Sequence, residues 1–332
     1  MEGILKSRTS RTWLFIAGYL IVLLGYSIID FGFNTAMIMG FSGLLQGMLI
    51  FMVAAGFSII FGLLDVLNFA QGAFFMIGAY VGMTVYLTLP PEIIPADLAF
   101  LIGIAAAVGI GFLLGLVTEV GLIRPLYSRP VFTLLMTFGL SAVIRETVLI
   151  LWGPAQLQVA PAPPMLDSSF TLLGQSFDVY RLFIIAMGII IMVGVLLLLR
   201  FTRIGIIIRA GLENSEMVEA LGINVRQVFT IVFVVGIVVA TLGGMIVTPF
   251  RGAYITMGDD FLLSAIIVVI IGGLGSFEGT AIASIMVGLT RAVAAQISLA
   301  YFSAPVLEEL SILAVMVFVL LVQPQGLFGR EE

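Results

Sequence analysis

The chain has 332 residues, of which 61% are hydrophobic and only 10% are charged, and its mean hydropathy is +1.24. A water-soluble domain is usually about 45–50% apolar and about 25% charged, so this composition requires a solvent other than water and indicates an integral membrane protein. The chain contains no cysteine and no histidine, which excludes disulfides, thiolate or imidazole catalysis and the usual zinc sites. The net charge of −5 says little, because the distribution of charge matters more in a membrane chain.

The only lysine is Lys6, which lies in a basic N-terminal tail. A P-loop places a lysine directly after its glycines so that the ammonium group reaches the phosphates of the nucleotide. No lysine of this chain occupies such a position. We therefore expect that the chain has no ATPase site of its own, that it is not an enzyme, and that it binds neither a cofactor nor a metal ion.

Long apolar runs follow one another along the chain, whereas a membrane β-barrel would have alternating segments of about ten residues. The first run, 12–30, lacks a clear small-residue cleavage site, so we expect a retained helix rather than a signal peptide. The other runs are 36–62, 66–89, 98–123, 131–151, 181–200, 227–250, 261–275, 279–299 and 305–322. The sequence predicts an all-α polytopic bundle of about ten transmembrane helices. Nine is the alternative, because 261–299 can form one broken span or two.

Positive charge gathers in alternate loops. Lysine and arginine occur before the first run, in the loops 124–129 and 200–226, and at Arg330 after the last run, and with ten spans all of these lie on one side. Because Lys and Arg mark cytoplasmic loops, both termini are predicted to be cytoplasmic. Arg181 and Arg251 are exceptions, because each lies at the edge of a run on the predicted external side.

Polar residues interrupt the apolar pattern at 65–72, where Asn68, Gln71 and Gly72 follow Asp65. Backbone without helical hydrogen bonds is tolerated at membrane depth only inside protein or beside a water-filled cavity. The segment therefore predicts a substrate pathway or a broken helix near the midplane. The alternative, with equal weight, is that Asn68 and Gln71 form hydrogen bonds across a pair of helices.

The cytoplasmic loop 201–226 contains an amphipathic stretch. Three apolar residues form one face, three glutamates lie on the polar face, and a glycine follows that suits a helix C-terminus. These residues are Met217, Val218, Leu221, Glu213, Glu216, Glu219 and Gly222. Helices that lie on lipid favour Lys and Arg on their polar face, so the acidic face favours a protein partner.

Four glycines lie within the eight residues 272–279, which cannot continue a regular helix without a cost in free energy. The segment superficially resembles a dinucleotide-binding motif, but that motif needs a preceding strand and a βαβ unit, whereas apolar runs flank this one. We predict a hinge or a sharp turn between helices, formed by Gly272, Gly273, Gly275 and Gly279.

Four segments, in this order, resemble the LivH-type permeases of branched-chain amino acid ABC importers. They are 65–80 with its Asn68-Phe-Ala-Gln-Gly72 core, the connector Arg124-Pro-Leu126, the loop 209–224, and the glycine turn 271–279. The resemblance runs from about residue 36 to the end. It divides the chain into 1–33, a tail with an additional helix, and 34–332, a permease domain. Gln71 stands at the family's histidine position, so we expect no titration there.

The resemblance implies a permease that moves its substrate by alternating access in a prokaryotic cytoplasmic (inner) membrane. The partners it implies are a second LivM-type permease or an identical copy, two ABC ATPase subunits that bind ATP and Mg, and an extracytoplasmic substrate-binding protein. No nucleic acid is expected. The resemblance gives the loop 201–226 the role of coupling to the ATPases. Glu216 and Gly222 keep the spacing of the general EAA loop, although Met217 and Val218 replace its alanines.

The resemblance favours branched-chain amino acids as the substrate, but permeases for urea, short amides and other amino acids belong to the same family. Two function classes compete with an ABC permease. One is an ion-coupled secondary transporter that works alone, although the sequence contains no clear chain of acidic groups for proton transfer. The other is a subunit that assembles with a transporter but conducts nothing.

Overall fold

The computed structural model describes residues 2–127, 129–154, 161–172, 174–213, 217–218, 221–222, 224–302, 304 and 306–329. For 2–11, 172, 204, 209 and 211–213 it describes the backbone only. The described helices are α1 (Glu2–Phe31), α2 (Phe33–Leu64), α3 (Gln71–Thr88), α4 (Ala96–Thr118), α5 (Pro130–Trp152), α6 (Val179–Phe201), α7 (Arg203–Glu213), α9 (Val225–Arg251), α10 (Met257–Gly272), α11 (Phe277–Ile297) and α12 (Val306–Val322). Shorter turns of helix, Glu119–Ile123 and Arg124–Leu126, extend α4, and Ser298–Phe302 extends α11.

Each predicted apolar run contains a helix in the structure, which confirms an all-α polytopic membrane protein. Within the described residues, seven segments are long and apolar enough to cross a membrane. They are Thr12–Phe31, Phe33–Leu64, Ala96–Leu126, Pro130–Trp152, Val179–Phe201, Val225–Arg251 and Phe277–Phe302. The runs on α3, α10 and α12 form shorter helices of 18, 16 and 17 residues. The region 261–299 contains two helices, because α10 ends at Gly272 and α11 begins at Phe277.

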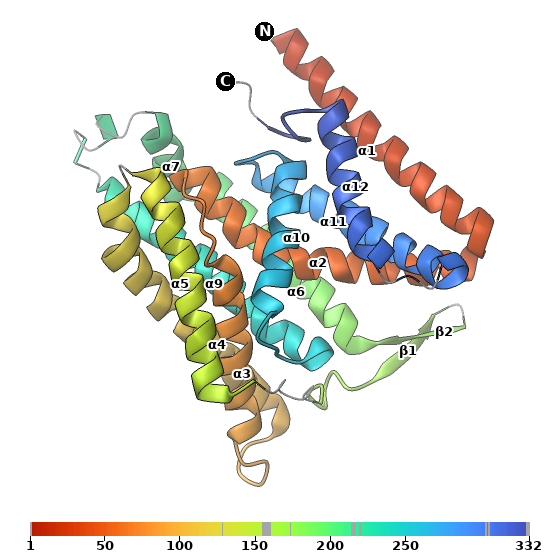
Figure 1. Cartoon of the computed structure of the whole chain (residues 1–332), viewed down its shortest axis with the longest axis horizontal. Coiled ribbons are helices and arrows are strands. Elements are labelled where there is room, and N and C mark those ends of the chain that lie inside the picture. The colour runs from red at the N-terminus through yellow and green to blue at the C-terminus, as the bar shows by residue number, and fades with distance from the viewer. Residues whose placement is uncertain are drawn as a thin grey trace.

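The core of the bundle lies around α2 and α9. In both helices 78% of the most apolar window is buried, compared with 11% in α1 and 17% in α5. Almost every residue of α2 between Leu45 and Ile60 is buried, on all sides of the helix. A helix that is apolar all round and buried all round is surrounded by other helices. In Figure 1, α1 lies at the outside of the bundle next to α12, and α4 and α5 form the opposite side.

A two-stranded antiparallel hairpin, which was not predicted from the sequence, lies between α5 and α6 along the chain. It joins β1 (Ser169–Leu172) to β2 (Gln175–Asp178), with Ser169 opposite Asp178. The ring of Phe177 stacks on Phe170 and also meets Phe41 of α2, at 5.7 and 4.7 Å between ring centroids. The hairpin therefore packs on the end of the bundle (Figure 1).

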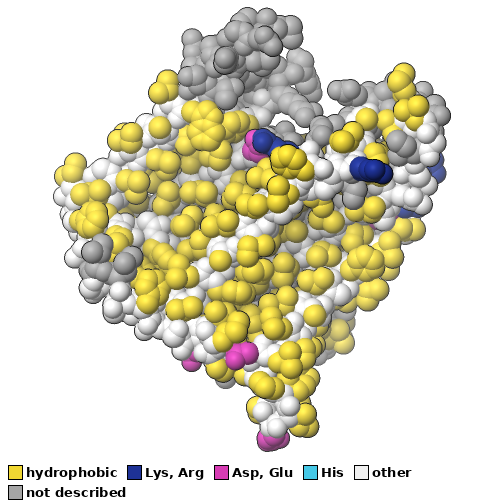
Figure 2. Space-filling model, turned by 180° about the vertical axis from the view of Figure 1, so that it is seen from behind, with side chains coloured by type: hydrophobic (Ala, Val, Ile, Leu, Met, Phe, Trp, Pro, Cys, Tyr) yellow, Lys and Arg dark blue, Asp and Glu magenta, His cyan; other side chains and the backbone are white. Residues whose placement is uncertain are grey.

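Charged side chains lie near the two ends of the described surface, as the charge pattern of the sequence predicts. Figure 2 shows a broad lateral face covered by hydrophobic side chains, with basic side chains and one acidic neighbour near one end and only acidic side chains near the other. Charged groups are costly in hydrocarbon and collect where a chain meets water. This apolar face thus suits contact with lipid or with another membrane subunit.

Candidate functional site

The connection between α2 and α3 is not helical although it lies inside the bundle. α2 ends at Leu64, Asp65 adopts a left-handed φ of 52°, and α3 begins at Gln71. The predicted run 66–89 is therefore helical only from residue 71. The local reason is that the Asn68 side chain accepts a hydrogen bond from the backbone N–H of Ala70 at 3.1 Å, which competes with helix formation.

Asn68 and Gln71 lie together in this connection and are fully buried. Asn68 Nδ2 donates to Gln71 Oε1 at 3.1 Å, and Gln71 Nε2 donates to the carbonyl oxygen of Gly236 on α9 at 2.9 Å. Gly236 is 11 residues into α9, or roughly 16 Å from its start, so the network is deep in the bundle. Two roles were predicted for these residues. The hydrogen bond across a pair of helices is present for Gln71, between α3 and α9. The role in a substrate pathway stays a prediction.

Thr137 of α5 completes this network, although its role could not be predicted from the sequence. Its buried hydroxyl accepts a hydrogen bond from the N–H of Phe69 at 3.2 Å, and it lies 3.2 Å from the carbonyl oxygen of Leu67, to which it can donate. The backbone groups of a broken helix need such partners at membrane depth. The only signal in the sequence was a hydroxyl on an apolar helix, which is too common to identify one position.

Glycines allow the helices to approach closely around the broken segment. A Cβ atom on Gly72 would lie 2.0 Å from the carbonyl oxygen of Gly258 on α10. On Gly56 of α2, a Cβ atom would lie 2.1 Å from the carbonyl oxygen of Gly236 and 2.1 Å from Gln71 Nε2. Small residues permit such contacts between membrane helices. Gly72, predicted to line the pathway, thus packs directly against α10.

A buried charge cluster joins the end of α4 to α9. The carboxylate of Glu119 is fully buried and lies 3.0 Å from Arg124 Nη2, which also donates to Thr230 Oγ1 at 2.7 Å. Tyr127 donates to the same carboxylate at 3.0 Å. Burial, followed by the negative charge of Glu119, raises the pKa of the Tyr127 phenol above its ordinary value of 10.0. The connector after α4 is therefore fixed to α9.

The glycine turn between α10 and α11 is tight and well packed. Gly273 and Gly275 have φ of 99° and 82°, a region that favours glycine. A Cβ atom on Gly279 would lie 2.0 Å from the carbonyl oxygen of Gly272. Near the C-terminus, Phe328 N–H donates to the same Gly272 oxygen at 2.9 Å. The predicted sharp turn is present, and the role of these glycines as a hinge stays a prediction.

The coupling loop is described only in part. Glu216 and Glu219 lie outside the described residues, and for Glu213 only the helical backbone is described. Gly222 has a φ of 80°, as expected for a glycine at the end of a helix. Val218 is buried, whereas Met217 and Leu221 are exposed by 63% and 75%. At the start of the loop, Arg200 forms an ion pair with Glu278 in the first turn of α11.

These features define a class of protein: a polytopic α-helical membrane protein with a broken helix and close glycine contacts in its core. Residues 39–320 match the family described as branched-chain amino acid transport system / permease component, and the chain belongs to this family of ABC-importer permeases. The membership confirms the resemblance to LivH-type permeases. Subunits of this kind are not themselves ATPases.

The chain is similar to the high-affinity branched-chain amino acid transport system permease protein LivH of Escherichia coli K12. The two are 28% identical over 305 residues, which is 88% of this chain and 95% of LivH. The permease protein BraD of a Pseudomonas aeruginosa branched-chain amino acid system is 24% identical over 88% of this chain and 95% of BraD. The fructose import permease FruF of Bifidobacterium longum is 32% identical over 33% of this chain and 32% of FruF. No solved structure matches the chain.

Proposed function

We propose that this chain is the membrane-spanning permease subunit of an ATP-driven importer of branched-chain amino acids. The observation that carries the proposal is the family match over residues 39–320, together with LivH and BraD, each of which aligns with 88% of the chain. Import of fructose is the second candidate, because FruF is 32% identical over 117 residues. FruF aligns with 33% of this chain, whereas LivH and BraD each align with 88%, so a branched-chain amino acid is favoured over fructose as the substrate.

The substrate moves by alternating access along a path beside the broken segment, with Asn68, Gln71 and Gly72 at its closed point. Support comes from the burial of Asn68 and Gln71 and from the bond between Gln71 Nε2 and the Gly236 oxygen. Separation of α3 from α9 would break this bond and turn both amides toward the opening. A packed interface with two discrete arrangements is a common basis for such switching.

The loop 201–226 couples this movement to the ATPase subunits, with Glu213, Glu216, Glu219 and Gly222 as the coupling residues. The ion pair between Arg200 and Glu278 supports the route, because it joins the start of the loop to α11 directly after the glycine turn. A displaced loop would therefore pull on Gly272–Gly279, which would act as the hinge. Exchange of Glu216 and Gly222 for alanine should abolish uptake and spare assembly, and normal uptake in this variant would contradict the assignment.

The same proposal includes the arrangement in the membrane. Ten helices span the prokaryotic inner membrane, both termini are cytoplasmic, and 1–33 adds one peripheral helix to the permease domain 34–332. The partners are a LivM-type permease or a second copy of this chain, two ATPase subunits that bind ATP and Mg, and an extracytoplasmic binding protein. The apolar lateral face in Figure 2 suits contact with the second permease.

The proposal is tested by affinity purification in mild detergent, followed by uptake into vesicles that contain the purified assembly. We expect two ATPase subunits and a second permease to co-purify, and we expect ATP-dependent uptake of labelled leucine when the binding protein is supplied. A chain that stays alone and takes up solute along an ion gradient would identify a secondary transporter. Uptake of fructose without leucine would support the second candidate.

A further inference from the structure

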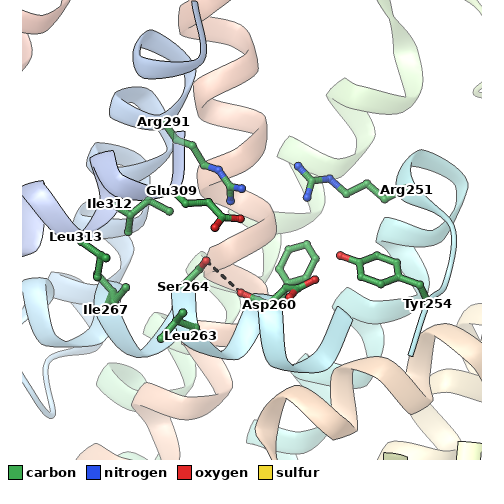
Figure 3. A pocket seen from close by; sticks show the side chains of 11 residues that line it. Arg251, Tyr254, Asp260, Leu263, Ser264, Ile267, Arg291, Glu309, Ile312 and Leu313 are labelled. Carbon is green, nitrogen blue, oxygen red and sulfur yellow. Dashed lines mark hydrogen bonds between the residues drawn. The ribbon is translucent and has the colours of Figure 1, made fainter. Parts of the chain in front are cut away.

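A cavity of about 300 Å³ lies between the end of α9 and the helices α10, α11 and α12 (Figure 3). It is on the predicted external side, because α9 ends here after starting at the cytoplasmic loop 201–226. The volume is at the lower limit for small-molecule sites, which are usually about 300–1,000 Å³. The cavity is separate from the broken segment, since none of the residues 65–72 lines it.

One half of the cavity carries charges of both signs. Figure 3 shows the guanidinium groups of Arg251 and Arg291 pointing toward each other across the opening, with the carboxyl groups of Asp260 and Glu309 nearby. Arg291 uses Nε to bind Glu308 at 2.5 Å, and its terminal nitrogens face the cavity (Figure 3). Two guanidinium groups with acidic groups beside them can bind a ligand that carries both a carboxylate and an ammonium group.

Neighbouring side chains hold these groups in position. The guanidinium of Arg251 lies 5.8 Å from the centre of the Phe261 ring, a distance typical of cation–π contact. Tyr254 and Asp260 both line the charged half of the cavity. Burial, followed by the charge of Asp260, raises the pKa of the Tyr254 phenol, so the hydroxyl stays protonated and can donate to that carboxylate. The charged half of the cavity is therefore partly ordered before a ligand enters.

The other half of the cavity is aliphatic. It is formed by Leu263 and Ile267 of α10 and by Ile312 and Leu313 of α12. Ile267 and Ile312 are 5% and 4% exposed and form the floor, whereas Leu263 and Leu313 are exposed at the rim. Such a wall favours an apolar side chain that leaves water. A sugar would leave both the charges and the aliphatic wall without matching groups.

We propose that this cavity is an entry site for a zwitterionic α-amino acid with an aliphatic side chain. Arg251 and Arg291 bind its carboxylate, Asp260 and Glu309 bind its ammonium group, and the aliphatic wall covers its side chain. The inference rests on the proposed function and adds a site to it, at which the substrate is held after release from the binding protein.

The test measures equilibrium binding of labelled L-leucine to the purified assembly without ATP. Asp260→Asn and Glu309→Gln each keep the shape of the side chain and remove its charge. We expect each to weaken leucine binding about tenfold, which corresponds to one lost charge-assisted hydrogen bond. 4-Methylpentanoate lacks the ammonium group, so its competition should be equal in these variants and the parent. Glu92→Gln, at an exposed acid before α4, is the matched control and should bind leucine normally.

A second variant tests the aliphatic wall. Leu313→Phe fills part of the cavity from its exposed rim, so it should lower the affinity for leucine more than that for alanine. Co-purification of the ATPases and the second permease shows that each variant is assembled. Loss of the second permease in Glu309→Gln, with unchanged leucine binding, would identify a socket for a protein partner and overturn the inference.

The two levels of the proposal fail in different ways. If the parent assembly imports leucine and all cavity variants bind it equally, the cavity is not the entry site, while the proposed function stands. If the parent assembly transports no leucine under any condition, the proposed function itself is wrong. Equal affinity of the parent for leucine and 4-methylpentanoate would contradict recognition of the ammonium group.

Discussion

The hydroxyl of Thr137 gives the sharpest test of the broken segment, because one atom satisfies backbone groups of another element. It accepts from Phe69 N–H and can donate to the Leu67 carbonyl, each at 3.2 Å. Thr137→Val keeps the shape of the side chain and removes both interactions. The part-buried N–H of Phe69 then loses its acceptor on α5, and such a loss costs about 1–3 kcal/mol.

The single hydroxyl proton is shared between the carbonyl oxygens of Leu134, at 3.0 Å, and Leu67, at 3.2 Å, so the Phe69 N–H is the main group affected and we expect a loss of roughly 1–3 kcal/mol. Thr147→Val on the same helix is the matched control. Its hydroxyl is exposed and donates to the Val143 carbonyl at 2.7 Å within α5, so its loss should change the stability by no more than about 0.5 kcal/mol. Thr137→Ser keeps the hydroxyl and loses one methyl group, worth about 0.8 kcal/mol.

The assay is the apparent Tm of the purified assembly in one detergent, together with ATP-driven leucine uptake in vesicles. Thr137→Val should lower the apparent Tm by roughly 2–5 °C, Thr137→Ser should recover most of the loss, and Thr147→Val should match the parent. Equal Tm values for Thr137→Val and Thr147→Val would refute the reasoning that the hydroxyl supports the broken helix.

Gly72→Ala should cost about 1–3 kcal/mol and lower the Tm, because its Cβ would lie 2.0 Å from a carbonyl oxygen of α10, whereas Gly109→Ala has no atom within 4 Å and should be neutral. Arg124→Met leaves the buried Glu119 carboxylate without its cation and should lower the free energy of unfolding by about 3–5 kcal/mol. The double variant with Glu119→Gln should recover part of this loss in a denaturation experiment. The chain has no histidine, so its stability should vary little from pH 6 to 9. Above about pH 10 the unfolded state ionises Tyr127, whose pKa is raised in the folded state, so stability should fall, and less steeply in Tyr127→Phe.

The positions of the helices could be predicted from the sequence, because a membrane span needs a long apolar run whatever surrounds it. The glycine turn at 272–279 was also predictable, since four glycines in eight residues leave few other conformations. The start of α3 could not be predicted, because the Asn68 side chain forms a local hydrogen bond and the helix begins only after it. The hairpin of β1 and β2 was missed in the same way, since four-residue strands leave little pattern.

The sequence by itself determined that this protein lies in a membrane, that it is helical, that it lacks a P-loop lysine, and which segments are typical of its family. Only the tertiary structure decided which apolar helices are central, because lipid tails and neighbouring helices are equally apolar partners. It also decided the polar contacts, since Gln71 meets Gly236 across 165 residues and Phe69 meets Thr137 across 68. The cavity between α9 and α12 exists for the same reason: its charges belong to four separate helix ends, which only the packing of those helices brings together.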